Sequence, residues 1–195
     1  MEKEFNWIDF NKARINTPPR ETLLFALKKF SGEGEANRSA FDIGCGPGND
    51  TAELLSKDWK VTATDNNPDI INYLEPLLKK YKSKLQIQIT SFEDIKWKKT
   101  ELINASFTLP FCPKEYFIYL WNNIRANIKV GGRFSGQFFG MNDEWKSLIR
   151  HTRKEILEIF SGFAIELIGE IEKDDNTALG EMKHWHIFNV VAKKK

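Results

Sequence analysis

Residues 41–50 form a glycine-rich turn with acids on either side, reading Phe-Asp-Ile-Gly-Cys-Gly-Pro-Gly-Asn-Asp. The turn contains three glycines, Gly44, Gly46 and Gly48. Because glycine has no side chain, a ligand can lie directly against the backbone there. Asp42 ends the apolar run before the turn, and Asp65 ends the next apolar run. An acid in that second position accepts hydrogen bonds from a ribose in doubly wound nucleotide folds. The pattern therefore predicts a site for an adenosine-containing cofactor.

The charge of Asp42 narrows the choice of cofactor. A dinucleotide turn of the form G-x-G-x-x-G would place its third glycine at position 49, where this chain has Asn49. The carboxylate of Asp42 would also repel a pyrophosphate, whereas it would attract a cation. S-adenosylmethionine carries an ammonium and a sulfonium at one end and a ribose at the other, so it suits both Asp42 and Asp65. A nicotinamide or flavin enzyme, or a glycine turn that only reverses the chain, is the alternative.

Strand-like and helix-like patterns alternate along the chain, which predicts an α/β fold with a parallel sheet and crossover helices to position these residues. The expected strands are 39–43, 60–64, 85–90, 102–105, 133–139, 164–171 and 184–192. The expected helices are 21–30, 50–57, one that begins after Asn67 and Pro68 and is kinked at Pro76, 113–128 and 152–160. The last two strands follow each other directly, which predicts an antiparallel pair joined by a polar loop at 172–183.

Local signals indicate where the helices begin and end. Asn49 and Asp50 are expected to cap the helix after the turn, and Asp50 has the capping-box spacing to Glu53. Thr152 is the expected N-cap of the helix that follows it. The pair Gly131 and Gly132 is expected to end the helix at 113–128.

At these motifs the chain resembles the class I S-adenosylmethionine-dependent methyltransferases. Their first motif reads acid-x-G-x-G-x-G after a strand, and their second is an acid that closes the next strand. The resemblance runs from about Ser39 to the C-terminus. It implies a Rossmann-like, doubly wound sheet of seven strands, mostly parallel with the last strand antiparallel, and helices on both faces. Residues 104–113, together with Lys183-His184-Trp185-His186, resemble small bacterial methyltransferases of the tellurite-resistance and thiopurine types.

The resemblance also implies which residues hold S-adenosylmethionine. The loop after the third strand, Ser91-Phe92-Glu93-Asp94, would hold the adenine, with Phe92 against the purine and Glu93 or Asp94 accepting from its amine. The backbone of the segment that starts at Asn104 would run past the sulfonium. This segment lacks the Pro-Pro-aromatic pattern of DNA amino-methylases. The expected cofactor residues are Asp42, Gly44, Gly46, Gly48, Asp65, Asn66, Ser91, Phe92, Glu93, Asn104 and Ala105.

The expected acceptor site draws on separate parts of the chain. Its candidates are Arg14, Arg20, Phe107, Phe111 and Trp185. The N-terminal segment 1–30 either closes over the cofactor as a lid, with an arginine for an anionic substrate, or packs as an ordinary helix with an aromatic lead-in. The two phenylalanines either face the transferable methyl group, where a ring favours a sulfonium, or fill the core beneath a loop.

His184 is the candidate general base. It shares a strand face with His186, while Trp185 points to the other face. If the strand is antiparallel to the others, its start lies at the ligand-binding edge of the sheet. The alternative is a pair of partly buried histidines that bond neighbouring loops. Two histidines without a third ligand do not predict a metal site. A thiolate or neutral amine needs no base, so the catalytic residue is left open.

Composition agrees with one small cytoplasmic domain, residues 1–195, whose core begins at residue 39. The chain has 195 residues, 41% of them hydrophobic, and a net charge of +2 from 29 basic and 27 acidic residues. This balance gives no overall field for nucleic acid, and the lysine clusters are interpreted as solvated helix ends, a loop and a tail. The two cysteines, Cys45 and Cys112, suggest no disulfide framework. The start lacks the regions of a signal peptide, and no apolar run reaches membrane-spanning length.

The expected function is transfer of a methyl group from S-adenosylmethionine to a small-molecule acceptor by in-line displacement. A protein or RNA methyltransferase of the same fold is one alternative, and its substrate would require a wide positive or grooved surface. A module that binds S-adenosylmethionine without turnover is the other. The identity of the acceptor and the oligomeric state are left open.

Overall fold

The computed structural model describes residues 6–34 and 38–195 of the chain. The first five residues, on which the expectation about a signal peptide depends, lie outside the described part. The helices are α1 (Trp7–Arg14), α2 (Glu21–Ser31), α3 (Asn49–Ser56), α4 (Ile70–Lys80), the short 3-10 helix η1 (Leu109–Phe111), α5 (Lys114–Asn127) and α6 (Arg153–Ile159). The strands are β1 (Ser39–Ile43), β2 (Lys60–Asp65), β3 (Leu85–Ile89), β4 (Thr100–Ala105), β5 (Ile128–Gly140), β6 (Arg150–His151), β7 (Phe163–Asn176) and β8 (Met182–Lys194).

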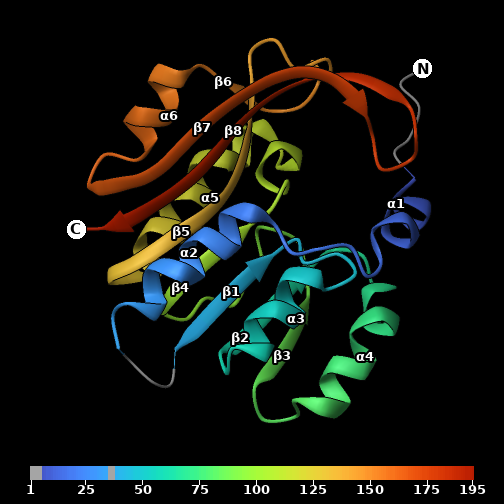
Figure 1. Ribbon diagram of the computed structural model, residues 1–195, viewed down its shortest axis with the longest axis vertical. Coiled ribbons are helices and arrows are strands. Elements are labelled where there is room, and N and C mark those ends of the chain that lie inside the picture. The colour runs from blue at the N-terminus through green and yellow to red at the C-terminus, as the bar shows by residue number, and fades with distance from the viewer. Residues whose placement is uncertain (1–5, 35–37) are drawn as a thin grey trace.

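The strands form one mixed sheet with the order β3-β2-β1-β4-β5-β8-β7 (Figure 1). Strands β1 to β5 pair in parallel, and β8 runs antiparallel to both of its neighbours, β5 and β7. This confirms the Rossmann-like sheet with a reversed last strand. Within the described residues, the two-residue strand β6 adds an eighth member beside the end of β5. The strand order reverses between β1 and β4, and in open α/β sheets that switch point is where ligands bind.

Helices cover both faces of the sheet, over two hydrophobic clusters. One cluster includes Leu120, Trp121 and Ile124 of α5 and Ile156 of α6. The other includes Leu23 and Ala26 of α2, Leu54 of α3 and Leu74 of α4. Neighbouring strand residues go to different clusters, as Ala40 and Phe41 do, because successive side chains of a strand point to opposite faces. The alternating arrangement expected from the sequence is therefore confirmed.

The expectation that Gly131 and Gly132 end α5 is wrong, because α5 already ends at Asn127 and both glycines lie within β5. The chain enters the sheet at once, and Ile128 pairs with Thr100. A Cβ atom on Gly132 would come within 2.6 Å of the carbonyl oxygen of Glu101 on the neighbouring strand. The glycine therefore allows a close approach of two strands at an irregular point of their pairing.

The polar segment 172–183 is largely strand, so its prediction as a loop is also wrong. Pairing between β7 and β8 continues to Asn176 and Met182, and the tight turn between them closes with the amide of Thr177 donating to the carbonyl of Glu181 over 2.8 Å. Figure 1 shows this long hairpin running past the rest of the sheet towards α1. Residues 170–176 of β7 are all exposed, which explains why their polar composition resembles that of a loop.

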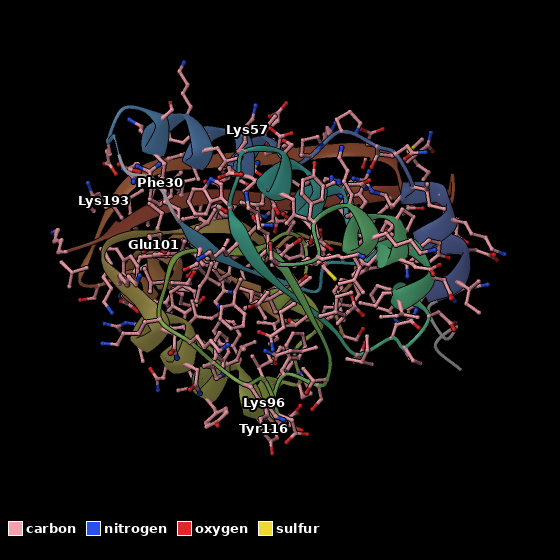
Figure 2. The ribbon with its side chains drawn as sticks, turned by 90° about the horizontal axis from the view of Figure 1, so that it is seen from below. Phe30, Lys57, Lys96, Glu101, Tyr116 and Lys193 are labelled. Carbon is pink, nitrogen blue, oxygen red and sulfur yellow. The ribbon has the colours of Figure 1, made fainter. Side chains whose placement is uncertain are left out.

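The described part of the chain has no helix long and apolar enough to cross a membrane. Lys96 and Lys193, which belong to two of the lysine clusters, lie at well-separated places on the molecule (Figure 2). Other members of the same two clusters come closer together, because burial and then the charge of Lys99 lower the pKa of Lys194.

Candidate functional site

A cavity of about 1230 Å³ lies at the carboxyl ends of the parallel strands, beside the switch point of the sheet. It is lined by residues that follow β1, β2, β3 and β4, by the N-terminal segment, and by the end of β5 and the β7–β8 hairpin. Most of the residues predicted from the sequence lie on its surface. These are Arg14, Arg20, Asp42, Gly44, Gly46, Asp65, Asn66, Ser91, Phe92, Glu93, Phe107, Phe111 and Trp185.

The glycine turn is held in a shape that other residues adopt poorly. Gly44 has a φ of +63°, and a Cβ atom there would come within 2.1 Å of the hydroxyl oxygen of Thr108. That hydroxyl donates to the carbonyl of Ile43 over 2.9 Å, which ties the turn to the loop after β4. Gly46 has a φ of +50° and faces the cavity. Gly48 does not line the cavity; at a φ of +86° it starts α3 and lies against Leu74.

Asp65 lies at the end of β2 with its carboxylate beside the turn. One carboxylate oxygen accepts from the amide of Gly46 over 3.0 Å, and the other accepts from the amide of Asn67 over 2.9 Å. Burial raises the pKa of Asp65, and the amides of Asn67, Gly46 and Asn66 oppose this shift. A carboxylate oxygen can accept two hydrogen bonds, so both oxygens of Asp65 can still accept a bond from a hydroxyl group.

Asp42 and Asp50 are two buried carboxylates joined by one amide. The side-chain nitrogen of Asn104 donates to both of them over 2.9 Å. Thr51 donates to Asp42 over 2.6 Å, and Ser135 donates to the amide oxygen of Asn104 over 2.7 Å. Burial, followed by the charge of Asp50, raises the pKa of Asp42 to about 7, while the bonds from Thr51 and Asn104 act the other way. Both carboxylates line the cavity, so a cation bound there would stabilise their charged forms.

Asn104 and Ala105, two of the expected cofactor residues, do not line the cavity. Both are fully buried. Asn104 instead holds the two carboxylates in place from behind, and the backbone of Ala105 packs against Gly136 on the neighbouring strand. Both residues end β4 as expected, but the side chain of Asn104 is hydrogen-bonded to the two carboxylates and that of Ala105 lies in the hydrophobic core.

The capping expected of Asn49 and Asp50 is wrong. Gly48 is the N-cap of α3 and makes no side-chain capping bond. Asp50 instead accepts from the hydroxyl of Ser106 over 2.6 Å and from the backbone amide of Arg20 over 2.8 Å. Asn49 donates to the carbonyl of Arg14 over 2.7 Å. Both side chains are used to bind other segments, so the capping box between Asp50 and Glu53 does not form.

These bonds hold the N-terminal segment along the cavity. Trp7, Phe10, Asn11, Arg14 and Arg20 all line it. The segment therefore has the position that a lid requires, although movement of the segment stays a prediction.

Five aromatic residues line the cavity and form what we call the aromatic wall: Phe107, Phe111, Phe139, Trp145 and Trp185. Neighbouring rings have centroids 5.5 to 6.3 Å apart, mostly edge to face. Phe107 has a φ of +55°, in the left-handed region that a bulky residue adopts only under strain. Strain at a residue whose ring lines a cavity is a mark of functional sites.

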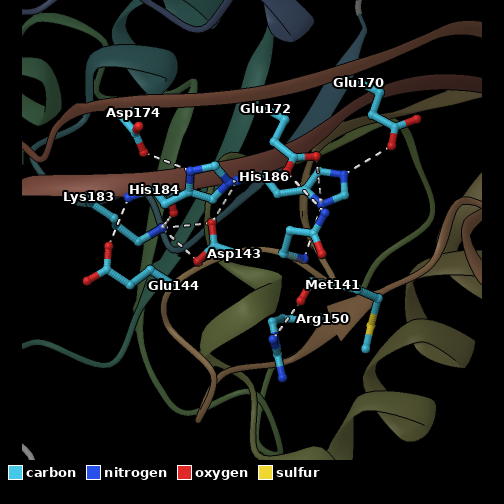
Figure 3. A network of polar contacts seen from close by, with 11 residues as sticks. Met141, Asp143, Glu144, Arg150, Glu170, Glu172, Asp174, Lys183, His184 and His186 are labelled. Atoms are coloured by element: carbon cyan, nitrogen blue, oxygen red, sulfur yellow. Dashed lines mark hydrogen bonds and ion pairs between the residues drawn. The ribbon is translucent and has the colours of Figure 1, made fainter.

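A buried ion pair lies behind this wall (Figure 3). The ammonium of Lys183 donates to both oxygens of Asp143 over 2.6 and 2.7 Å, and the two side chains are 2% and 0% exposed. The same ammonium lies 3.7 Å from the ring centroid of Trp185, 4.4 Å from that of Trp145 and 4.9 Å from that of Phe139. Burial lowers the pKa of Lys183, and the bond to Asp143 opposes this shift. Sequence reasoning missed Asp143, Lys183, Phe139 and Trp145 as parts of the site.

His184, the candidate base, does not line the cavity. Its ring lies between two carboxylates of β7, with Nδ1 2.7 Å from Asp174 and Nε2 3.2 Å from Glu172 (Figure 3). The bonds to Asp174 and then Glu172 raise the pKa of His184, which is 38% exposed. His186 contacts Glu170 over 3.0 Å and accepts from the amide of Asn142 over 3.2 Å. Both histidines therefore bond neighbouring segments, which was the alternative reading, while Trp185 faces the cavity as its place on the strand predicted.

Comparisons with known proteins agree with this geometry. Residues 40–132 match the model of a family described as a methyltransferase domain. Carboxy-S-adenosyl-L-methionine synthase of Pseudoalteromonas translucida (strain TAC 125) is 23% identical over 124 residues, covering 60% of this chain and 52% of that protein. The chain thus spans about half the length of this curated relative.

Two solved structures are similar over most of the chain. TehB from Haemophilus influenzae has a TM-score of 0.78 at 17% identity, covering 97% of this chain and 68% of that one. The second is 1,6-didemethyltoxoflavin-N1-methyltransferase of Burkholderia thailandensis, solved with bound 1,6-didemethyltoxoflavin and S-adenosylhomocysteine. It has a TM-score of 0.70 at 17% identity, covering 90% of this chain and 77% of that one. At this level of identity the likeness shows the fold.

Proposed function

We propose that this chain, a class I S-adenosylmethionine-dependent methyltransferase, transfers a methyl group from its cofactor to a small-molecule acceptor. The observation that carries the proposal is one cavity that joins the glycine turn and two strand-end acids, Asp42 and Asp65, to an aromatic wall. The first part suits the cofactor and the second suits an acceptor. S-adenosylmethionine, when bound, supplies an electrophilic methyl group and a neutral thioether leaving group.

The residues at the cofactor end fit that molecule in charge and in shape. In this proposal Asp65 accepts from the ribose hydroxyls, and Glu93 accepts from the adenine amine beside Phe92. Asp42 lies where the cationic part of the cofactor gains from a buried carboxylate, and Gly44 and Gly46 let it approach the backbone. All six residues line the same cavity.

The chain's contribution to the reaction is orientation of the acceptor and exclusion of water. None of the three histidines lines the cavity within the described residues. The arrangement thus favours an acceptor that attacks the methyl group without a histidine base to remove its proton, such as a thiolate or a neutral amine. His184 is not carried forward as a base.

The aromatic wall of the cavity favours a small molecule over a protein or RNA substrate. A ring-lined pocket buries a small, largely apolar ligand well.

The test begins with calorimetric titration of S-adenosylmethionine and S-adenosylhomocysteine into the protein. Thiol, amine, phenol and metalloid acceptors are then screened, and formation of S-adenosylhomocysteine is the readout of methyl transfer. We expect Asp65→Asn to weaken binding of S-adenosylhomocysteine by about 1 to 3 kcal/mol, because a charged acceptor of hydrogen bonds is lost. Asp69→Asn is the matched control, since Asp69 is exposed and does not line the cavity. Binding of NADH in place of both cofactor forms would contradict the proposal, and binding without turnover of any acceptor would favour the non-catalytic alternative.

A further inference from the structure

Two guanidinium groups in the cavity have no hydrogen-bonded partner among the described residues. Arg14 and Arg20 both line the cavity and are partly buried. The backbone atoms of both residues make hydrogen bonds, with Asn49 and Asp50 respectively, but no bond joins either guanidinium to a described side chain or carbonyl. The arginine side chain has five N–H donors, and burying a charge without partners is costly.

The surrounding charges do not neutralise the pair. Burial and then the charge of Arg14 lower the pKa of Arg20 to about 10, so Arg20 is still charged at neutral pH. The charge of Asp50 opposes this shift, but it acts on Arg14 as well, so one carboxylate is shared between two guanidinium groups. Two partly buried guanidinium groups without a hydrogen-bonded anion indicate a ligand that brings anionic groups.

The proposed cofactor supplies only one such group. S-adenosylmethionine has a single carboxylate, which occupies one bidentate guanidinium. The second guanidinium is then available for an anion of the acceptor. Arg20 is the one placed for this role, because its guanidinium carbon lies 4.5 Å from the ring centroid of Phe107, in the aromatic wall.

The wall next to Arg20 is built of rings that contact one another. Phe107 contacts both Phe139 and Trp185, at centroid distances of 6.2 and 6.3 Å. The ammonium of Lys183, which is paired with Asp143 in the buried site of Figure 3, also contacts the ring of Trp185. A surface built of aromatic rings favours a flat ligand, since a planar ring packs against it without losing internal freedom.

We propose that the methyl acceptor is a planar aromatic acid, whose ring packs on the aromatic wall and whose oxyanion binds the guanidinium of Arg20. The proposal rests on the proposed function and names the substrate class of the same site. A carboxylate and a phenolate share the chemistry that Arg20 recognises.

The test measures binding, which does not depend on the accepting atom. The probes are 2-naphthoate, its neutral isostere 2-naphthamide, and the non-planar acid cyclohexanecarboxylate, each titrated calorimetrically into the protein saturated with S-adenosylhomocysteine. We expect 2-naphthoate to bind about tenfold tighter than either of the other two, because it alone gains both the charged hydrogen bonds and the ring contacts.

Three variants assign this preference to residues. Arg20→Gln should remove the preference for the acid over the amide. Arg20→Lys should keep part of it, because lysine keeps the positive charge but cannot donate two parallel hydrogen bonds to an oxyanion. Trp185→Leu should remove the preference for 2-naphthoate over cyclohexanecarboxylate. Arg153→Gln is the control, since this arginine of α6 does not line the cavity. Circular dichroism confirms that each variant is folded.

The outcomes separate this inference from the proposed function. If S-adenosylhomocysteine binds but 2-naphthoate and 2-naphthamide bind equally, the inference is overturned and the proposed function stands. If Arg20→Gln weakens S-adenosylhomocysteine about tenfold and leaves the preference for the acid intact, Arg20 serves the cofactor and the inference is again overturned. If S-adenosylhomocysteine does not bind to the unaltered protein, the proposed function itself fails and the inference fails with it.

Discussion

Replacing Lys183 with methionine removes one charge from a buried pair and leaves the other uncompensated. Methionine keeps the length of the side chain and its contacts with the rings around it. The partner, Asp143, is 0% exposed and also accepts hydrogen bonds from the backbone amides of Trp145 and His186 over 3.1 and 3.2 Å. These two bonds do not replace the cation, so the variant buries a carboxylate without its counter-ion.

The expected cost follows from this burial. Removing one partner of a buried ion pair costs about 3 to 5 kcal/mol of unfolding free energy. For a chain of this size, each kcal/mol lowers the midpoint of thermal unfolding by about 2 to 4 °C, so the Lys183→Met variant should unfold about 6 to 20 °C below the unaltered protein. The double variant Lys183→Met with Asp143→Asn should be more stable than Lys183→Met alone, because no charge is then buried.

The assay is urea unfolding followed by circular dichroism, with a thermal scan of the same samples. Lys173→Met is the matched control on the same hairpin. Lys173 pairs with Asp175, but these side chains are 55% and 50% exposed, so its loss should cost less than about 1 kcal/mol. A Lys183→Met variant that loses no more stability than Lys173→Met would refute the reasoning.

Two further predictions concern the cofactor end. Gly44→Ala combines a φ of +63° with a Cβ atom 2.1 Å from the hydroxyl of Thr108, so it should weaken S-adenosylhomocysteine binding about tenfold or more, measured by calorimetry. Gly180→Ala is its control, because Gly180 has a φ of +82° with open space around it, and an unchanged affinity in Gly44→Ala would contradict the role of the turn. Because burial raises the pKa of Asp42 to about 7, a cationic ligand that favours the carboxylate should release a proton on binding near neutral pH and bind more weakly in acid. Calorimetry in two buffers of different ionisation enthalpy measures that proton, and equal binding enthalpies in both buffers would argue against it.

The cofactor end was predictable because its signals are local. Asp42 and Gly44 lie in one short stretch, and Asp65 ends the next strand. Alternation of strands and helices then brings both strand ends to the same edge of the sheet. No long-range information was needed to place them together.

The failures have a common physical cause, which is competition from tertiary partners. Asp50 has the sequence spacing of a helix cap, but Arg20, Asn104 and Ser106 bind its carboxylate instead. Gly132 resembles a helix stop, but it lies in a strand because the neighbouring strand passes too close for a side chain. A local pattern predicts a local bond only when no distant group competes for the same atoms.

The buried pair of Asp143 and Lys183 had no signal in the sequence. The two residues are 40 positions apart. They meet because β5 pairs with β8, so that the segment after β5 returns beside the start of β8. The lysine lay in a stretch that was expected to be a polar loop, and a lysine in such a loop gives no reason to expect burial.

The boundary of the family match bears on how the acceptor preference of such a protein can evolve. The matched residues, 40–132, include the glycine turn and Asp65, whereas Arg20, Trp145 and Trp185 lie outside them. On the proposed function, the half that binds the cofactor and much of the half that selects the acceptor are thus separate modules on one sheet. Substitutions in the hairpin can then evolve a new acceptor preference without disturbing the turn, whereas the N-terminal segment is bonded to the turn through Asn49 and Asp50. The hairpin is accordingly the part of this chain to exchange when engineering a different selectivity.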